Sequence, residues 1–168
     1  MPELELAVSA TTRERRPSEL DGREYWFLAE HEFDQKIAAD EFLEWVELDW
    51  GPRSGTLHSE IERIQGAGRV PLLDLETEGA LRVKRRVPGA LTVFVRAPSF
   101  EENERRLRAR GTEDEAEIRK RLDVARAQLA QIEEFDHVVV NDDFERAAGE
   151  LEAIIRRALT AAGTILRP

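Results

Sequence analysis

The sequence predicts an α/β fold in which helices wind around a mainly parallel sheet. Three short aliphatic and β-branched runs, Val70 to Leu75, Leu91 to Val95 and Val138 to Val140, alternate with longer helical segments. Short apolar strands separated by helices are typical of parallel α/β sheets. The 168 residues suit one domain, or a core with a small inserted subdomain, and suffice for a substantial hydrophobic core.

The N-terminal part predicts strands, a loop and one helix. Leu4 to Ser9 alternates like a strand, and Arg13 to Gly22 carries the turn residues of a loop. Strands over Glu24 to Leu28 and Phe42 to Leu48 flank a predicted helix over Glu30 to Ala39. This section therefore predicts a small α+β insert.

The second half predicts the helices that cover the parallel strands. A helix over Thr77 to Arg86 follows the first apolar run, and a second helix, for which Ser99 is a suitable N-cap, extends to Arg110. A long charged helix then continues to about Ile132. An amphipathic helix over Phe144 to Ala161 completes the alternation of strand and helix.

Composition excludes several classes of partner. The chain has 35 acidic and 25 basic residues, a net charge of −10, so repulsion disfavours a general nucleic-acid or anionic-membrane surface. It has no cysteine, no signal-type N-terminus and no apolar run of the ~18 residues that a membrane helix needs. We therefore expect a cytoplasmic protein. His31, His58 and His137 lack metal-ligand spacing and receive no role.

A group of hydroxyls, arginines and one phenol near the N-terminus predicts an anion site. Ser9, Arg13, Arg16 and Tyr25 lie at the end of the first predicted strand and in the loop after it. Guanidinium groups bind phosphate through paired, charge-assisted hydrogen bonds, and hydroxyls complete such a site without adding negative charge. The group suits the phosphate of a nucleoside monophosphate, although loop arginines are also commonly only solvated.

The glycine-rich motif that cradles a donor triphosphate has no counterpart in this sequence. No stretch reads G-x-x-x-x-G-K-S/T, and none of the three lysines follows a glycine. The residues therefore predict the acceptor half of a nucleotide site without the donor half.

The order of motifs resembles guanylate kinase, a nucleoside monophosphate kinase of the P-loop class, nearly from end to end. Each motif alone is weak, but the ordered set is specific. The matching residues are Val8 to Arg13 with Arg16 and Pro17; Asp21, Gly22 and Tyr25; Gly55 and Thr56; Asp74, Leu75, Glu76, Gly79 and Ala80; Arg106, Arg110, Gly111 and Thr112; Arg121; and Val140, Asn141, Asp142 and Asp143.

The resemblance implies a single guanylate-kinase-like domain over residues 1–168. Its expected architecture is a three-layer, P-loop-kinase-like parallel sheet with a small α+β insert for GMP, about 10–69, and a helical lid, about 106–121. Guanylate kinases begin with a strand, the glycine loop and a helix that precede the region matched here. We therefore expect the central first strand and the Walker A loop to be absent, and the chain to be poorly stable, or to bind another strand or itself through the open slot.

The resemblance also implies roles for individual residues. Arg13, Arg16 and Tyr25 would hold the GMP phosphate, while Ser9, Glu44, Thr56 and Glu76 would line the guanine. Guanine presents N1–H and N2–H donors beside two acceptors, so facing carboxylates and hydroxyls would reject adenine by leaving buried groups unpaired. A solvated strand end is the ordinary alternative for the acidic residues.

On the donor side the resemblance implies arginines that neutralise the transferring phosphoryl group. These are Arg106, Arg110 and Arg121, whose alternative is a salt-bridged, exposed helix. Asn141 would lie on the adenine side of ATP and Asp74 on the Mg²⁺ side. Mg²⁺ is expected to enter with ATP, as in the family.

Two departures from the family bear on the site. The family's Asn, Tyr, Tyr, Gly, Thr run is replaced here by Pro52, Arg53, Ser54, Gly55 and Thr56, and Tyr25 is the only tyrosine of the chain. A second phosphate-binding phenol is therefore excluded, and Arg53 is a candidate for electrostatic compensation.

The sequence leaves three hypotheses for the function. The first is phosphoryl transfer from ATP to GMP, giving ADP and GDP, with weak activity expected for the chain as written because the glycine loop is missing. The second is an inactive binding module that recognises GMP or a phosphopeptide through Arg13, Arg16 and Tyr25. The third is a remnant without a ligand.

Overall fold

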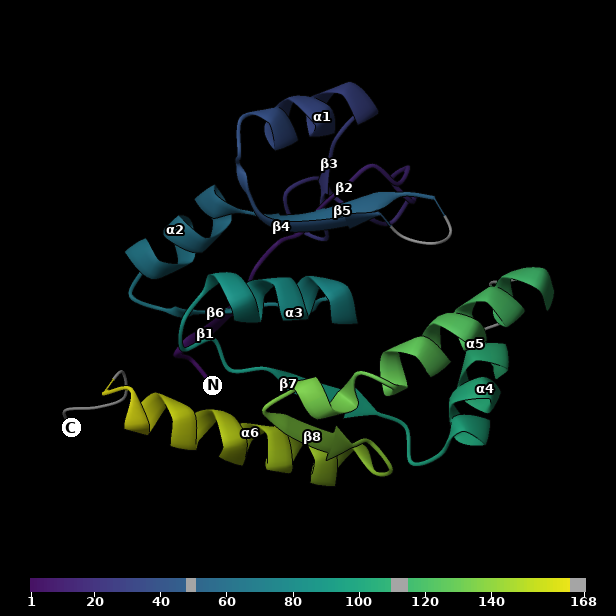
Figure 1. Cartoon of the computed structure of the whole chain (residues 1–168). Helices are drawn as coiled ribbons and strands as arrows, with labels where there is room; N and C mark the ends of the chain where they lie inside the picture. The colour runs from purple at the N-terminus through teal and green to yellow at the C-terminus, as the bar shows by residue number, and fades with distance from the viewer. Residues whose placement is uncertain (48–50, 110–114, 164–168) are drawn as a thin grey trace. The chain divides into compact units, whose positions relative to one another are not determined.

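The computed structural model describes residues 1–47, 51–109 and 115–163 (Figure 1). Those residues fall into two compact parts, a first unit over Met1–Val87 and a second unit over Pro88–Pro168. Each unit combines parallel strand pairing with helices, as the sequence predicts for an α/β fold.

The first unit contains a four-stranded sheet and a two-stranded sheet. Its strands are β1 (Leu4–Leu6), β2 (Ala10–Thr11), β3 (Trp26–Phe27), β4 (Phe42–Glu47), β5 (Arg53–Leu57) and β6 (Val70–Leu72). Its helices are α1 (Glu30–Ala38), α2 (His58–Gly66) and α3 (Thr77–Arg86).

The four-stranded sheet has the order β3-β2-β5-β4. Strand β2 is parallel to β3 and antiparallel to β5, and β4 is antiparallel to β5. Gly55 lies where β4 and β5 approach most closely: a Cβ there would meet the Glu44 carbonyl oxygen at 2.6 Å and the Trp45 Cβ at 2.7 Å. Only glycine therefore fits at this point of the pairing without a backbone shift.

Helix α1 packs on one side of this sheet through an aromatic core (Figure 1). Phe33 of α1 is fully buried and stacks on Phe42 of β4, with ring centroids 4.4 Å apart. Ala10 and Leu57 complete the buried cluster. Burial of such side chains contributes roughly 1.5–3 kcal/mol for each large residue.

Helix α3 is hydrogen-bonded to β4, an edge strand of the four-stranded sheet. The Arg82 guanidinium donates to the Trp45 carbonyl, and Arg86 donates to the Leu43 carbonyl at 2.7 Å. These bonds occupy backbone acceptors of the outer strand that would otherwise need water or another strand. They also hold the second half of α3 beside β4.

The two-stranded sheet pairs β1 with β6 in parallel, with Leu4 opposite Val70. Glu60 of α2 is 3 % exposed and accepts a hydrogen bond from the Val8 amide at 3.0 Å. The Arg63 guanidinium, which donates to the same carboxylate, is the main reason that the pKa of Glu60 is lowered. Glu60 thus anchors the segment between β1 and β2 to α2.

The second unit contains one parallel strand pair and three longer helices among its described residues. Its elements are β7 (Val93–Arg96), α4 (Phe100–Ala109), α5 (Glu115–Leu129), a 3-10 turn (Ile132–Glu134), β8 (His137–Val140) and α6 (Phe144–Ala161). Strands β7 and β8 pair from Val93 opposite His137 onward.

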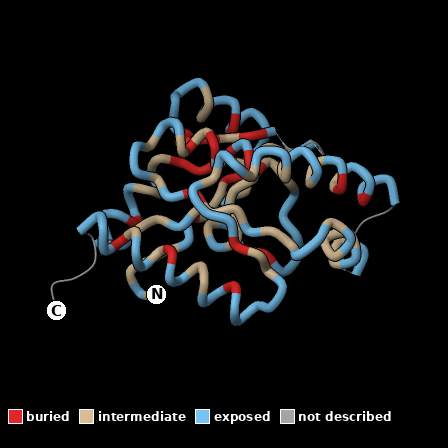
Figure 2. Tube along the Cα trace, turned by 60° about the horizontal axis from the view of Figure 1, so that its bottom comes forward, coloured by how far each residue is buried: buried red, intermediate tan, exposed pale blue. Residues whose placement is uncertain are grey.

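Helix α6 covers the β7–β8 pair. Buried residues recur along it at Ala147, Ile154 and Leu159, with exposed positions between them (Figure 2). Ala147 and Ile154 form a cluster with Val139 of β8. The Asp143 carboxylate accepts from the Arg146 amide at 2.9 Å and so caps the first turn of the helix.

The structure agrees with most predicted elements and adds several short ones. Helices α3 and α6 have the predicted bounds, and the parallel strands are present but shorter or shifted by a few residues. Strands β2 and β5, helix α2 and the 3-10 turn were not predicted. Strand β5 reads Arg-Ser-Gly-Thr-Leu, which has low strand propensity, and α2 follows it directly with no side-chain N-cap bond.

Candidate functional site

The predicted phosphate residues gather in the loop after β2. The Arg13 guanidinium lies over the Tyr25 ring at 5.3 Å and over the Phe27 ring at 5.6 Å. Its Nη2 donates to Glu19 Oε1 at 2.7 Å, and its Nη1 donates to the Glu14 carbonyl at 2.7 Å. The structure therefore brings Arg13 and Tyr25 together, as predicted.

Arg16 is joined to the same group through its backbone. Its amide donates to Glu19 Oε2 at 2.9 Å, whereas its guanidinium lies 4.0 Å from Glu19 Oε1 and its side chain is 68 % exposed. Arg13 is the more enclosed of the two arginines, with a side chain that is 25 % exposed. One guanidinium is thus held within the loop and the other reaches toward solvent.

Glu19 is the residue of this loop that sequence reasoning missed. It is 9 % exposed, and hydrogen bonding by the Arg13 side chain, helped by the Arg16 amide, lowers its pKa. The carboxylate is therefore ionised at neutral pH. Its spacing of six residues from Arg13 and three from Arg16, within a loop, was the available signal.

The predicted guanine residues include a buried carboxylate and hydroxyl pair. Glu44 of β4 and Thr56 of β5 are directly paired across the strands, and the Thr56 hydroxyl donates to Glu44 Oε1 at 2.9 Å. Glu44 is 2 % exposed and Thr56 is 1 % exposed. Burial raises the pKa of Glu44, and the Thr56 hydrogen bond opposes that rise. A buried carboxylate with capacity for further hydrogen bonds suits a ligand that brings N–H donors.

The first turn of α3 closes on Glu44. A Cβ at Gly79 would lie 2.7 Å from Glu44 Oε2, which is closer than such atoms approach. Glu76, the half-buried N-cap residue of the same helix, lies three residues earlier. The structure therefore places one predicted guanine residue, Glu76, at the helix end that packs on another, Glu44.

The remaining predicted residues of the first unit have less enclosed positions. Ser9 is half-buried, accepts from the Trp26 amide through its carbonyl at 2.9 Å, and precedes Ala10, which pairs with Gly55 beside Thr56. Asp74 is exposed in the segment that follows β6. Ser9 is thus next to the carboxylate and hydroxyl pair along the sheet, and Asp74 follows the end of a parallel strand.

The Arg53 guanidinium, a candidate for the phosphate site, is engaged with helix α1. Its side chain is 14 % exposed, pairs with Glu30 and Asp34 of α1, and lies over the Phe33 ring at 4.8 Å. Its backbone carbonyl accepts from the Thr11 hydroxyl at 2.9 Å. The Arg53 side chain therefore links α1 to β5. Its positive charge is paired with the acidic residues of α1, so it does not supply the extra charge that was expected for the phosphate site.

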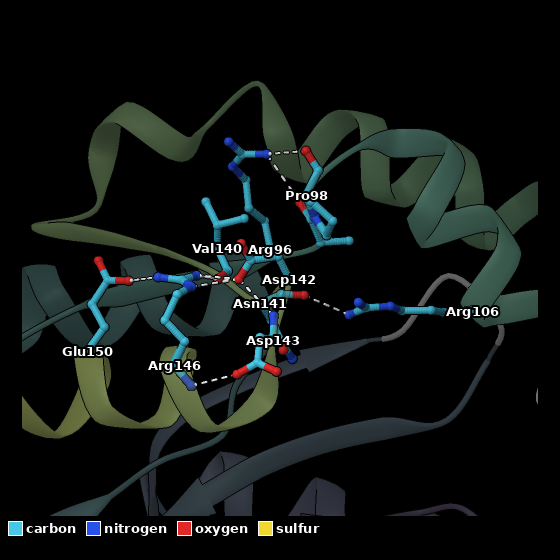
Figure 3. Close-up of polar contacts among 10 residues, drawn as sticks. Arg96, Pro98, Arg106, Val140, Asn141, Asp142, Asp143, Arg146 and Glu150 are labelled. Atoms are coloured by element: carbon cyan, nitrogen blue, oxygen red, sulfur yellow. Dashed lines mark hydrogen bonds and ion pairs between the residues drawn. The ribbon is translucent and has the colours of Figure 1, made fainter.

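In the second unit, two predicted donor-side residues meet at the end of β8 (Figure 3). Arg106 of α4 donates through Nη1 to the Asn141 carbonyl at 2.9 Å and through Nε to Glu102 Oε1 at 2.7 Å. Hydrogen bonds from Arg105 and then Arg106 lower the pKa of Glu102 to about 2. Arg106 and Asn141 thus border the same strand end.

The other two arginines predicted for the lid are placed differently. Arg121 is half-buried on α5, whereas Arg110 lies outside the described residues. Arg146 of α6 donates to the Val140 carbonyl and pairs with Asp142 and Glu150 (Figure 3). Arg106 and Arg146 therefore donate hydrogen bonds to backbone carbonyl groups at the C-terminal end of β8.

Within residues 1–47, 51–109 and 115–163, no three His, Cys, Asp or Glu side chains are grouped to hold a metal ion. Over the same ranges no helix has the length and apolar character to span a membrane.

An arginine and phenol group together with a buried carboxylate and hydroxyl pair, carried on an α/β framework, is the arrangement expected of a nucleoside monophosphate kinase. The comparisons with known proteins make this specific. A family model described as guanylate kinase matches residues 3–158. The chain belongs to the guanylate kinase family.

Curated relatives and a solved structure agree with this assignment. The chain is 43% identical to the guanylate kinase of Corynebacterium jeikeium (strain K411), over 93% of this chain and 84% of that protein. It is 45% identical to the guanylate kinase of Rubrobacter xylanophilus, over 94% and 82% of the two chains. The crystal structure of guanylate kinase from Anaplasma phagocytophilum superposes with a TM-score of 0.77 at 27% identity, covering 93% of this chain and 76% of that one. The predicted family and its α/β fold are confirmed.

Proposed function

We propose that the first unit binds GMP and that the protein transfers the terminal phosphoryl group of ATP to it, giving GDP and ADP. Membership of the guanylate kinase family supports the reaction, and the curated relatives are named for it. The observation that carries the assignment of the acceptor site is the pairing of an arginine loop with a buried Glu44–Thr56 pair in one unit.

The GMP phosphate is proposed to bind at the arginine loop. Arg16, whose side chain is largely exposed, supplies a planar guanidinium for bidentate hydrogen bonding. Arg13 adds positive charge next to it, and the Tyr25 hydroxyl supplies a neutral donor. A phosphate needs this combination because it offers several acceptor oxygens around a double negative charge.

Guanine is proposed to be read by Glu44, Thr56, Ser9 and Glu76. The Glu44 carboxylate would accept from N1–H and N2–H, while hydroxyl groups would donate to O6. Adenine has no N2 amino group and its N1 is an acceptor, so it would leave the buried carboxylate unpaired. A site that loses such a hydrogen bond to a charged group forfeits about 1.5–3 kcal/mol, which is roughly tenfold or more in affinity.

ATP is proposed to enter as its Mg²⁺ complex, so that Mg²⁺ is part of the substrate. Asn141 would lie on the adenine side and Asp74 on the Mg²⁺ side. Arg106, Arg110 and Arg121 would offset the charge of the transferring phosphoryl group, and the acceptor oxygen would attack in line with the leaving group. In this proposal residues 1–168 act as one catalytic domain, with 10–69 as the GMP region and 106–121 as the lid.

A binding module is the second candidate, because the printed sequence contains no G-x-x-x-x-G-K-S/T motif. Without a lysine and glycine loop for the donor triphosphate, this polypeptide is proposed to turn over slowly by itself. Its acceptor site could then serve to recognise GMP or a phosphopeptide.

Calorimetry and a coupled assay separate these candidates. Titration of the 168-residue chain with GMP, AMP and a phosphoserine peptide is expected to show preferred binding of GMP, reduced at least tenfold by Arg16→Ala. Preference for the peptide would favour the binding module. Equal affinity for GMP and AMP would contradict the proposed guanine site, and rapid turnover in an ADP-release assay would contradict the slow-turnover proposal.

A further inference from the structure

We infer that Glu19 is a positioning residue of the phosphate site: its buried carboxylate holds the Arg13 guanidinium and the Arg16 backbone in their binding geometry. This inference rests on the proposed GMP function and deepens it. Glu19 was not among the predicted site residues, and its role follows from the contacts of the loop between β2 and β3.

The two oxygens of the Glu19 carboxylate serve different groups. Oε1 accepts from Arg13 Nη2 at 2.7 Å, and Oε2 accepts from the Arg16 amide at 2.9 Å. The side chain is 11 % exposed, so these bonds are shielded from most competing water. One carboxylate therefore connects the side chain of one predicted phosphate ligand to the backbone of the other.

Backbone contacts close the same loop on Glu19. Its amide donates to the Arg16 carbonyl at 3.0 Å, and its carbonyl accepts from Arg15 Nη1 at 2.6 Å. Together with the carboxylate, every polar group of Glu19 is engaged with Arg13, Arg15 or Arg16. The conformation of the whole Arg13 to Glu19 segment thus depends on this residue.

The orientation of Arg13 is consequently set before a ligand arrives. Its guanidinium is held on one edge by Glu19 and the Glu14 carbonyl, and its plane lies near the Tyr25 and Phe27 rings. A long arginine side chain loses about 1.5–2 kcal/mol of rotamer entropy when it is immobilised. Because the loop has already ordered Arg13, phosphate binding avoids much of this cost.

The negative charge of Glu19 repels a phosphate, but we expect this repulsion to be smaller than the gain from holding Arg13 and the Arg16 backbone in place. The segment from Arg13 to Glu19 has three arginines and two glutamates, so it keeps a net positive charge with Glu19 ionised. Both oxygens of the Glu19 carboxylate face donors within the protein, so the repulsion on a phosphate at the exposed Arg16 side chain acts over a longer distance and next to solvent. Exposed interactions of this kind are strongly screened.

Glu19→Gln tests the inference because it keeps the size and removes one acceptor. A glutamine amide has a single acceptor oxygen, and its NH₂ group would face either the Arg13 guanidinium or the Arg16 amide, both of which are donors. Glu14→Gln is the matched control. Glu14 is exposed, and it contacts Arg13 through its backbone carbonyl, which the substitution keeps.

The readout is the affinity for GMP relative to guanosine, measured on the full chain by calorimetry with guanosine as a competitor. Glu19→Gln is expected to weaken GMP binding about tenfold while guanosine binding changes less than twofold, and Glu14→Gln should change neither. Glu19→Asp, which keeps the charge, should retain more of the GMP preference than Glu19→Gln, and it carries the test if the glutamine variant does not fold.

An unchanged GMP preference in Glu19→Gln, or equal weakening of GMP and guanosine, would overturn the positioning role. These results would leave the proposed function in place. If the parent chain itself binds GMP no better than guanosine, the proposed phosphate site fails, whatever the variants do.

Discussion

Replacement of Gly79 by alanine tests whether a glycine is required at this position of α3 to leave room for the Glu44 carboxylate. The new Cβ would lie 2.7 Å from Glu44 Oε2, 3.4 Å from Glu44 Cδ and 3.7 Å from the Leu75 Cβ. Only the first distance is shorter than an ordinary contact, so the carboxylate must move by several tenths of an ångström. Glu44 is buried and bonded to Thr56, so that movement disturbs the hydrogen bond between them.

Two opposing effects set the size of the change in stability. Alanine in place of glycine within a helix stabilises by about 1 kcal/mol. Overpacking a buried site costs about 1–3 kcal/mol. The free energy of unfolding of Gly79→Ala is therefore expected to fall by about 0–2 kcal/mol. GMP affinity is expected to fall about tenfold or more, because the displaced carboxylate loses a charged hydrogen bond worth about 1.5–3 kcal/mol.

Gly149→Ala provides the matched control. Gly149 lies within α6, and none of the described atoms comes within 4 Å of an added Cβ. The same substitution should therefore raise the free energy of unfolding by about 0.5–1 kcal/mol and leave GMP binding unchanged.

Urea unfolding and calorimetry with GMP measure both quantities for each variant. In a Glu44→Ala background the steric conflict disappears, so Gly79→Ala should there stabilise as Gly149→Ala does. If Gly79→Ala in the parent chain stabilised as much as Gly149→Ala and kept full GMP affinity, the proposed fit between α3 and Glu44 would be refuted.

Three other predictions concern charged side chains. Arg53→Ala should lower the free energy of unfolding by about 1–2 kcal/mol in urea, since it removes two partly exposed ion pairs and the contact with the Phe33 ring; no loss would show that Arg53 does not fasten α1. Because burial raises the pKa of Glu44 above its usual 4.5, the contribution of this carboxyl group to stability should be fully present below about pH 4.5 and should be lost as pH rises through the folded pKa. Glu44→Gln should abolish that loss in urea unfolding without GMP and should weaken GMP binding, whereas an unaltered pH profile would contradict this cause. The lowered pKa of Glu102, about 2, gives stability that is present above about pH 4.5 and lost as pH falls toward 2; urea unfolding at several pH values should show a steeper loss over this range in the parent than in Glu102→Gln, and equal slopes would contradict this cause.

Periodicity and composition were sufficient to predict the long elements. Helix α6 repeats apolar residues on one face and begins with an aspartate cap, and α3 ends in three basic residues, so both bounds could be read directly. The resemblance suggested that Glu44 and Thr56 share a role, but their pairing was not predicted, because the strand that carries Thr56 was not recognised.

The missed features depend on contacts between distant residues. Strand β5 contains few β-formers and is held by β2 and β4 on either side, which a local pattern does not reveal. Gly79 looks like an ordinary helix-weakening residue until Glu44 is seen beside it. Glu19 resembles a solvated loop carboxylate until its two oxygens are found on Arg13 and the Arg16 amide.

A crystal structure of the chain soaked with 5′-GMP tests the central claim most directly. We expect phosphate oxygens within hydrogen-bonding distance of the Arg16 guanidinium and the Tyr25 hydroxyl, with the guanine N–H groups at the Glu44 carboxylate. GMP bound at another surface, or absent from an intact fold at saturating concentration, would contradict it.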